Sequence, residues 1–208
     1  MVIRELKPSQ RVAGRWLIKL EDGSVLRVGE NEVVSFALYT GKDLTQEEVQ
    51  GLTAAAKHSG LKEKALNLLA RKPQSRKELE RKLGEWEATQ EESTAICDRM
   101  EELGYLNDEN YAGLIVRHYS GKGYGEKKLR DELYRRGVPR SLWEEALAGA
   151  ADPAPAIDAY LTKKLMGRTP DRKELQRVSA ALARRGFGWS DIKEALDRYA
   201  AEAEEWDG

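Results

Sequence analysis

Few side chains in this sequence have the types and spacing that catalysis or metal binding requires. His58 and His118 lie far apart, and neither has a Cys or His neighbour at the spacing of a metal site. Cys97 is the single cysteine, and no local motif supplies the base that a cysteine nucleophile needs. Acidic residues are abundant, but no isolated pair in a recognisable loop suggests general acid–base catalysis. The sequence therefore predicts a protein that is not an enzyme and that holds no metal or cofactor.

A glycine-rich segment at residues 121–125, Gly-Lys-Gly-Tyr-Gly, invites comparison with phosphate-binding loops. A P-loop follows a strand and ends in Gly-Lys-Ser/Thr, whose amides and hydroxyl hold phosphate and magnesium, and this segment has neither feature. We interpret it as a mobile loop between helices, with Lys122 available to a macromolecular partner.

Two predicted helices have a basic side opposite an apolar stripe. At about 100° per residue, residues 126–136 place Leu129 and Leu133 on one side. The basic side chains spread over the other side are Lys127, Lys128, Arg130 and Arg135. In a later helix the apolar stripe of Leu175, Val178 and Leu182 lies opposite Lys173, Arg177 and Arg184. Further basic residues nearby in the sequence are Arg117, Lys122, Lys163, Lys164 and Arg168. Repetition of the pattern favours a shared electropositive binding strip.

Charge is unevenly distributed, although the net charge is only −1. Residues 117–140 contain eight Lys or Arg against three acids, and residues 163–185 contain eight against two. Residues 85–110 contain nine acids against one Arg, and residues 191–208 contain seven acids against two bases. Composition alone leaves two interpretations open, which are ordinary solvated helix faces and a basic binding surface.

The composition is that of an ordinary folded protein, with 40 % hydrophobic and 34 % charged residues in a chain of 208. No apolar run approaches the roughly 20 residues that cross a bilayer. The N-terminus has no basic segment followed by an apolar one, so no secretory signal is expected. A single cysteine fits a reducing compartment. We therefore expect a cytoplasmic protein.

The N-terminal part, residues 1–58, predicts a small β unit followed by short helices. Residues 11–20 and 25–28 read as strands, and Asp22-Gly23 between them indicates a hairpin with a type I′ turn. Residues 30–38 have a short helical pattern, and Thr45 to Glu48 forms a capping box that opens a helix toward His58.

The remainder predicts helices separated by recognisable capping residues. Residues 75–78 and 141–144 read as capping boxes, each with Ser first and Glu fourth. Thr169-Pro170 reads as a cap followed by proline at the first helical position. Gly137 and Gly186 fit the position after a helix, where the left-handed conformation favours glycine.

Internal repetition sets the domain organisation. Residues 133–138 match residues 182–187 at an offset of 49, and Ser141, Ala146 and Leu147 recur at the same offset. A looser earlier copy runs through Leu79 and Ile96. We therefore predict a mainly α fold of tandem three-helix repeats in an elongated arrangement, behind a segment that contains a β-hairpin. The predicted units are 61–106, 107–150 and 154–201, with a linker at 148–156 and an acidic tail at 202–208.

These residues resemble the RecX regulatory proteins. The residues that match the central signature of that family are Leu103 to Asp108, Tyr111, Ala112, Arg117, Gly121 to Gly123, Leu129, Leu133, Gly137 and Val138. Residues 65–70 with Ser75, Glu78 and Leu79 are similar to the opening repeat, and residues 182–187 with Ile192 to the closing one. The resemblance covers about residues 61–200. Asn107-Asp108 departs from the usual acidic pair, and residues 85–92 are acidic where a basic helix end is usual.

The resemblance implies a modulator of the RecA recombinase. Such a protein binds along the groove of the RecA filament on single-stranded DNA and limits ATP hydrolysis, strand exchange and cleavage of the SOS repressor. The basic residues named above would contact acidic RecA residues, DNA phosphates or both, in a monomer with weak direct DNA binding. The alternative is a primary DNA-binding protein, since three-helix units with basic helices also describe helix-turn-helix modules.

Overall fold

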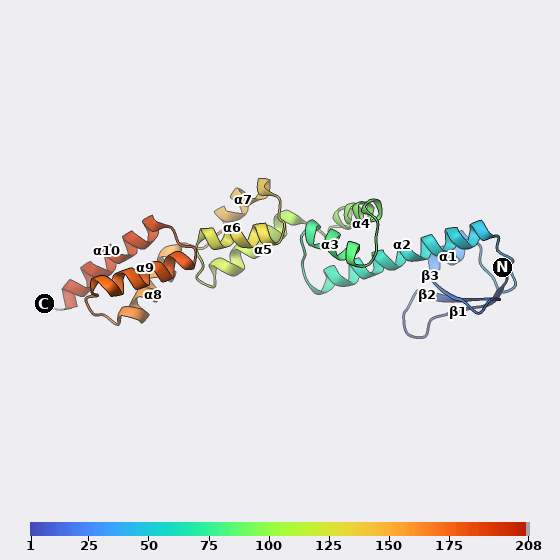
Figure 1. The fold of residues 1–208 in the computed structure, drawn as a ribbon, viewed down its shortest axis with the longest axis horizontal. Helices are drawn as coiled ribbons and strands as arrows, with labels where there is room; N and C mark the ends of the chain where they lie inside the picture. Colours follow the sequence, from blue (N-terminus) through green and yellow to red (C-terminus); the bar gives the residue numbers. More distant parts are fainter. Residues whose placement is uncertain (207–208) are drawn as a thin grey trace. The chain divides into compact units, whose positions relative to one another are not determined.

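The computed structural model describes residues 1–206, with side chains described through residue 202 (Figure 1). Three strands come first, β1 (Ile3–Pro8), β2 (Arg15–Leu20) and β3 (Val25–Gly29). The helices that follow are α1 (Glu30–Ser35), α2 (Gln46–Arg71), α3 (Arg76–Glu85), α4 (Gln90–Glu102), α5 (Asp108–Ser120), α6 (Glu126–Arg135), η1 (Arg140–Leu142), α7 (Trp143–Ala148), α8 (Pro153–Leu165), α9 (Arg172–Arg184) and α10 (Trp189–Trp206). Within this described range, no helix is both long and apolar enough to span a membrane. The fold is mainly α behind a β segment, which confirms the predicted fold class.

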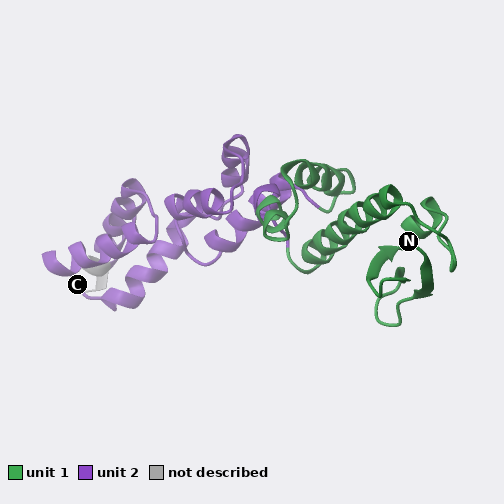
Figure 2. Cartoon of the chain, turned by 45° about the vertical axis from the view of Figure 1, so that its right-hand side comes forward, with its two compact units in different colours: residues 1–72, 79–105 green, residues 73–78, 106–208 purple. Residues whose placement is uncertain are grey.

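The chain divides into two compact units (Figure 2). Unit 1 contains residues 1–72 and 79–105, and unit 2 contains residues 73–78 and 106–208. The first turn of α3 therefore belongs to unit 2, while the rest of that helix belongs to unit 1.

Unit 1 begins with an antiparallel sheet in the order β1-β2-β3. Alternation along the strands places Ile18, Leu20 and Val28 in a core that also contains Ile3 and Leu52 of α2. The two strands of the predicted hairpin are confirmed, with β2 beginning at Arg15. Strand β1 was not predicted, because most of its side chains are exposed and polar and give no clean alternation.

The turn between β2 and β3 differs from the predicted type I′. Only Gly23 has a positive φ, at +88°. The amide of Gly23 donates to the carbonyl of Leu20 at 3.0 Å, and the amide of Leu20 donates to the carbonyl of Ser24 at 2.9 Å. The Asp22 carboxylate accepts from the amide and the hydroxyl of Ser24, at 2.9 and 2.7 Å. These bonds favour a tight turn that ends in one left-handed glycine.

Helix α2 begins with the predicted capping box. The Thr45 hydroxyl accepts from the amide of Glu48 at 3.1 Å, and the Glu48 carboxylate accepts from the amide of Thr45 at 2.8 Å. The helix does not end near His58 but continues to Arg71. Gly60 costs a helix only about 1 kcal/mol relative to alanine. Burial of Leu61 and later apolar residues on the same helix outweighs that cost.

Unit 2 contains two successive helix groups with separate cores. Helices α5, α6 and α7 surround residues that include Ile115, Leu129 and Leu133. Helices α8, α9 and α10 surround residues that include Leu161 and Leu182. Gly137 and Gly186 follow α6 and α9 with φ of +70° and +90°, as predicted.

Two predicted helix starts in unit 2 were wrong in detail. Ser141 lies inside η1 and caps no helix, because Glu144 accepts a hydrogen bond from Arg130 instead of reaching back to Ser141. Helix α9 begins after Asp171 rather than at Thr169-Pro170, since Asp171 has Glu174 three residues later and completes a capping box.

The predicted linker at 148–156 is partly helical. Helix α8 begins at Pro153, which is tolerated in a first turn because the missing amide would have had no helical partner. The Asp152 carboxylate caps the helix by accepting from the amide of Ala154 at 3.0 Å. The predicted acidic tail overlaps the end of α10, and its residues 207–208 lie outside the described range.

Candidate functional site

The best-defined junction in unit 2 joins the start of α6 to the end of α9. The amide of Gly125 donates to the carbonyl of Arg185 at 3.0 Å, and the amide of Lys127 donates to the carbonyl of Gly186 at 3.1 Å. Free amides at a helix N-terminus thus meet free carbonyls at a helix C-terminus. The opposite ends of the two helix dipoles add a favourable electrostatic contribution.

Glycine is required on both sides of this junction. A Cβ on Gly125 would lie 2.3 Å from the carbonyl oxygen of Gly186. A Cβ on Gly186 would lie 2.5 Å from the backbone nitrogen of Lys128, and the φ of Gly186 is +90°. The two backbones can therefore approach this closely only without side chains, so Gly125 is a buried junction residue rather than part of a mobile loop.

A groove of about 390 Å³ opens beside the junction. Its walls come from the first turns of α6 and from the end of α9, and its lining residues are Lys127, Lys128, Asp131, Ala183, Arg184 and Gly186. We call it the basic groove. The structure thus brings together three predicted binding residues from two different repeats.

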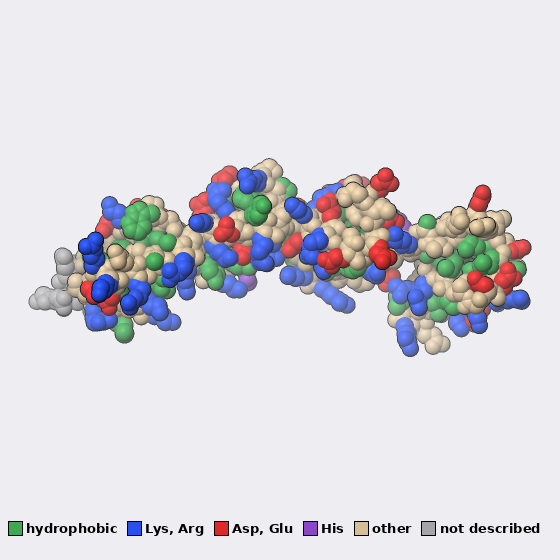
Figure 3. All heavy atoms as spheres, in the orientation of Figure 1, with side chains coloured by type: hydrophobic (Ala, Val, Ile, Leu, Met, Phe, Trp, Pro, Cys, Tyr) green, Lys and Arg blue, Asp and Glu red, His purple; other side chains and the backbone are tan. Residues whose placement is uncertain are grey.

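The twelve basic residues predicted from the sequence are mostly accessible. Those that are exposed are Arg117, Lys122, Lys127, Arg135, Lys163, Lys164, Arg168, Lys173, Arg177 and Arg184. Lys128 and Arg130 are half-buried. The surface view shows Lys and Arg distributed over the helical repeats together with acidic side chains (Figure 3). Lys127, Lys128 and Arg184 are brought together in one lined hollow, the basic groove.

Ion pairs within the chain engage several of these residues. Arg130 donates to Glu126 at 2.7 Å and to Glu144 at 2.9 Å, and these two carboxylates raise its pKa, with Glu144 contributing most. Arg168 lies 3.7 Å from Glu174. Among the described residues, Lys127 and Arg184 form no such pair. Within the basic groove, these two side chains are therefore more available to a partner than Lys128, which pairs with Glu132.

Glu132, which sequence reasoning did not single out, orients two of the predicted residues. Its side chain is 6 % exposed and receives Lys128 at 3.1 Å and Arg135 at 2.5 Å. Burial disfavours the charged form, but the hydrogen bonds from Arg135 and Lys128 outweigh burial and hold the pKa of Glu132 below its usual range. The signal in the sequence was an acid at four residues after Lys128 and three before Arg135 on one helix.

A related junction joins the first turn of α3 to the end of α6, also within unit 2. The Ser75 hydroxyl donates to the carbonyl of Arg136, while Ser75 keeps its predicted capping box with Glu78. A Cβ on Gly137 would lie 2.5 Å from the Lys77 side chain. The start of the second helix of one repeat thus meets the end of the second helix of the next repeat at both junctions.

A partly buried polar triad of Glu78, Tyr111 and Arg136 fixes this second junction. The Tyr111 hydroxyl donates to Glu78 at 3.0 Å and accepts from Arg136 at 2.7 Å. Burial, with the negative charge of Glu78, raises the pKa of Tyr111 to about 12. Sequence reasoning placed Tyr111 in the family signature but did not identify this contact, because its partners are distant along the chain.

Neither junction has the composition of an active site. Within the described part of the chain, no group of three or more His, Cys, Asp and Glu residues could hold a metal ion. Cys97 is fully buried in the helical part of unit 1. What the structure does present is basic surface in repeated helical units.

The fold and these junctions define a class, which is a protein of tandem three-helix repeats with a β segment in front. Comparison with family models identifies the particular family. Residues 62–100, 107–147 and 159–196 match the first, second and third three-helix domains of RecX, in that order and over more than half of the chain. The chain belongs to the RecX family.

Individual relatives agree with this assignment. The chain is 26 % identical over 208 residues to the regulatory protein RecX of Streptococcus pneumoniae strain Hungary19A-6, and the match covers 99 % of this chain and 80 % of the relative. It is 27 % identical over 200 residues to the regulatory protein RecX of S. pneumoniae serotype 19F strain G54, covering 95 % and 76 %.

Solved structures show the same fold. A crystal structure of regulatory protein RecX superposes with a TM-score of 0.74 at 21 % identity, over 94 % of this chain and 98 % of the other. The crystal structure of RecX from Lactobacillus salivarius superposes with a TM-score of 0.65 at 23 % identity, over 70 % and 97 %.

Proposed function

We propose that this chain is a non-enzymatic regulator that binds the RecA filament on single-stranded DNA and inhibits the recombinase, ATPase and SOS co-protease activities of RecA. Membership of the RecX family and relatives named regulatory proteins support this function. The protein would act in the cytoplasm, as a monomer, on a RecA filament rather than on a small substrate.

The observation that carries the proposal is the basic groove. Lys127 and Lys128 from one repeat and Arg184 from the next converge on one hollow, and Lys127 and Arg184 have no ion pair among the described residues. Separate repeats that each contribute charge to one site suit an acidic partner made of repeated subunits. Contacts on successive protomers then add through effective concentration, so modest individual contacts suffice.

The proposed contact set extends outward from the groove. It comprises Arg117, Lys122, Lys127, Lys128, Arg130, Arg135, Lys163, Lys164, Arg168, Lys173, Arg177 and Arg184. Within this set, Arg130 acts mainly through its ion pairs with Glu126 and Glu144, and Lys127 and Arg184 make the direct contacts.

A binding experiment tests the proposal. The double variant Lys127→Glu/Arg184→Glu reverses two exposed charges, and the matched control Arg71→Glu/Lys193→Glu reverses two exposed charges outside the contact set. We expect the groove variant to bind RecA-coated single-stranded DNA at least about tenfold more weakly, a loss of about 1.4 kcal/mol. We expect the control to stay within about twofold. Equal binding by both variants would remove the groove from the interface.

The second candidate function is direct DNA binding. Basic surface on three-helix units favours it, since phosphate neutralisation needs little more than Lys and Arg. The salt dependence of binding distinguishes the two functions, when affinity is measured separately for naked and for RecA-coated single-stranded DNA. Tight binding to naked DNA that falls steeply with salt would support a primary DNA binder, whereas a RecA regulator binds coated DNA much more tightly.

A further inference from the structure

The outer face of the N-terminal sheet, in unit 1, is basic and contains none of the residues of the proposed contact set. Strand alternation places Ile18, Leu20 and Val28 in the core, so the residues between them face outward. The strand register aligns Lys7 with Leu17 and Leu17 with Arg27 in one row across the sheet. Neighbouring rows on this side contain Arg15 and Lys19 of β2, two residues to either side of Leu17.

This face is hollowed into a groove of about 630 Å³, which we call the sheet groove. Its lining residues are Lys7, Pro8, Ser9, Gln10, Arg11, Val12, Arg15, Leu17, Val25 and Arg27. Four of these ten are basic and none is acidic. The floor is partly apolar, because Leu17 is half-buried and Val25 is 50 % exposed. Blue side chains gather around the loop between β1 and β2 in the surface view (Figure 3).

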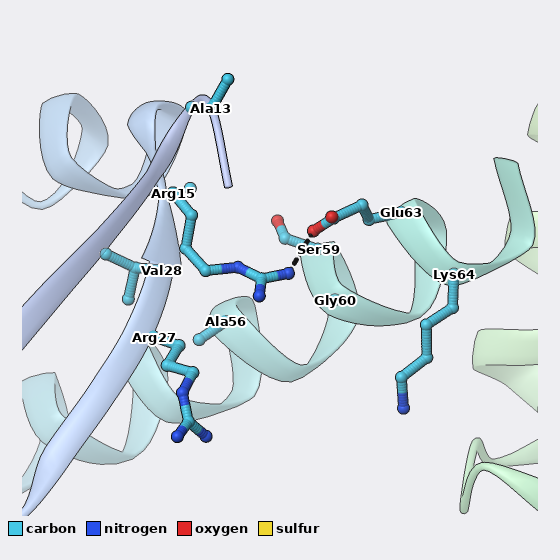
Figure 4. Close-up of a pocket in the computed structure, with 11 residues that line it drawn as sticks. Ala13, Arg15, Arg27, Val28, Ala56, Ser59, Gly60, Glu63 and Lys64 are labelled. Carbon is cyan, nitrogen blue, oxygen red and sulfur yellow. Dashed lines mark hydrogen bonds and ion pairs between the residues drawn. The ribbon is translucent and has the colours of Figure 1, made fainter. Parts of the chain in front are cut away.

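A second hollow of about 430 Å³ continues from this face to α2. It shares Arg15 and Arg27 with the sheet groove and adds Glu63 and Lys64 of α2 (Figure 4). The Arg15 guanidinium donates to Glu63 at 2.7 Å, and this ion pair fixes one wall. Figure 4 shows Arg27 and Lys64 well apart on different elements, each extending away from the Arg15–Glu63 pair. The two hollows thus form one path whose free charges are positive.

Acidic side chains neutralise only part of this surface. Lys7 pairs with Glu5 at 2.9 Å, and Arg15 pairs with Glu63. The hydrogen bond from Lys7 holds the pKa of Glu5 below its usual range. Arg11 and Arg27 form no ion pair with any residue that the structure describes. An excess of positive charge around a hollow without acidic lining attracts an anion.

We propose that the sheet groove binds the phosphate backbone of single-stranded nucleic acid. Strands lie about 4.8 Å apart, so Lys7 and Arg27 stand about 10 Å apart across β2. Arg15 and Lys19 add charges four residues apart along β2, about 13 Å from each other. This array of positive charges suits the backbone of single-stranded nucleic acid, which is a flexible chain of regularly spaced single negative charges. Leu17 and Val25 supply apolar contact to sugars and bases. Contacts from Lys and Arg to phosphate carry no sequence information, so binding is independent of base sequence.

The proposal goes beyond RecA regulation, because it concerns unit 1 and a bare nucleic-acid strand. Fluorescence anisotropy of a labelled oligothymidylate, titrated with the full chain at low salt, measures the binding directly. The test variant is Arg11→Gln/Arg27→Gln. The matched control is Arg71→Gln/Lys193→Gln, which removes the same charge from two other exposed positions. Circular dichroism verifies that both variants are folded.

We expect the sheet-groove variant to bind about fivefold or more weakly than wild type. Its slope of log affinity against log salt should fall by about 1.4, which is about 0.7 for each lost contact with a single strand. The control should match wild type within about twofold. The variant Glu5→Gln should bind more tightly, because it removes an acid from the same face and frees Lys7.

Three outcomes would overturn the proposal. The first is no measurable binding by wild type at low salt, and the second is equal weakening by the two double variants. The third comes from competition with polyglutamate at equal charge concentration. If polyglutamate displaces the labelled oligonucleotide as efficiently as unlabelled oligothymidylate does, the groove binds acidic peptides instead. Poor displacement by polyglutamate supports a nucleic-acid site.

Discussion

Replacing Gly186 with alanine tests whether the junction beside the basic groove holds unit 2 together. Gly186 has a φ of +90°, and a Cβ there would lie 2.5 Å from the nitrogen of Lys128. A left-handed conformation costs a non-glycine residue about 1–2 kcal/mol. Overpacking against backbone adds about 1–3 kcal/mol. We therefore expect Gly186→Ala to lower the free energy of unfolding by about 2–5 kcal/mol.

Gly104 supplies a matched control. It follows α4 as Gly186 follows α9, with φ of +74° and the same pattern of closing hydrogen bonds. A Cβ on Gly104 would meet nothing within 4 Å. Gly104→Ala should therefore lower the free energy of unfolding only by the cost of the left-handed conformation, about 1–2 kcal/mol.

The assay combines urea unfolding with amide hydrogen exchange. Because the chain has two compact units, exchange locates the loss that a single unfolding curve would average. In Gly186→Ala, the amide of Lys127 should exchange faster, since its acceptor is the carbonyl of Gly186. In Gly104→Ala, the exchange rate of the Lys127 amide should stay the same as in wild type. Equal losses of stability and unchanged exchange at Lys127 would refute the view that close backbone approach at Gly186 maintains the junction.

Three further predictions concern side chains in unit 2. The depressed pKa of Glu132 stabilises the fold above the unfolded-state pKa of about 4.3, and that stability is lost as pH falls through the folded-state pKa. Glu132→Gln should therefore have a lower free energy of unfolding than wild type at neutral pH, and that free energy should fall less than the wild-type value on acidification. Urea unfolding at several pH values measures both effects. For Tyr111, spectrophotometric titration at 295 nm should show one tyrosine ionising near pH 12, absent in Tyr111→Phe, and a wild type in which all tyrosines ionise near pH 10 would contradict the triad. Arg130→Ala should change stability by less than about 1 kcal/mol, because exposed ion pairs contribute little, and a larger loss on thermal unfolding would show that its pairs are structural.

The sequence predicted the repeats and much of the surface because both depend on local periodicity. Leu129 and Leu133 are buried, while Lys127 and Arg135 of the same helix are exposed, since helical spacing alone determines those sides. Gly137 and Gly186 end their helices in the left-handed conformation for an equally local reason.

The junctions could not be predicted in the same way. The sequence led us to interpret Gly125 as part of a flexible loop. In the structure this glycine lets two backbones approach each other closely, and the residue that it contacts, Gly186, lies in another repeat. Ser75 and Gly125 each precede the second helix of a repeat, and each meets the end of the next repeat's second helix. This equivalence held a usable signal, because equivalent positions in tandem repeats tend to make equivalent contacts. The triad of Glu78, Tyr111 and Arg136 likewise depends on contacts between repeats.

Strand β1 and the exact helix starts show the limits of local signals. Strand β1 is defined by pairing with β2, and its polar side chains carry no burial pattern. Ser141 had a good capping sequence, but an ion pair between Arg130 and Glu144 competed for the glutamate. Tertiary contacts decided both cases.

The measurement that most directly tests the regulatory function is the ATPase rate of RecA on single-stranded DNA as this protein is added at substoichiometric amounts. The proposal predicts a fall in rate well below one regulator per RecA. It also predicts a weaker effect for Lys127→Glu/Arg184→Glu and an unchanged effect for Arg71→Glu/Lys193→Glu. An ATPase rate that the wild-type protein leaves unchanged, while it binds naked DNA tightly, would contradict the proposal and favour the DNA-binding function.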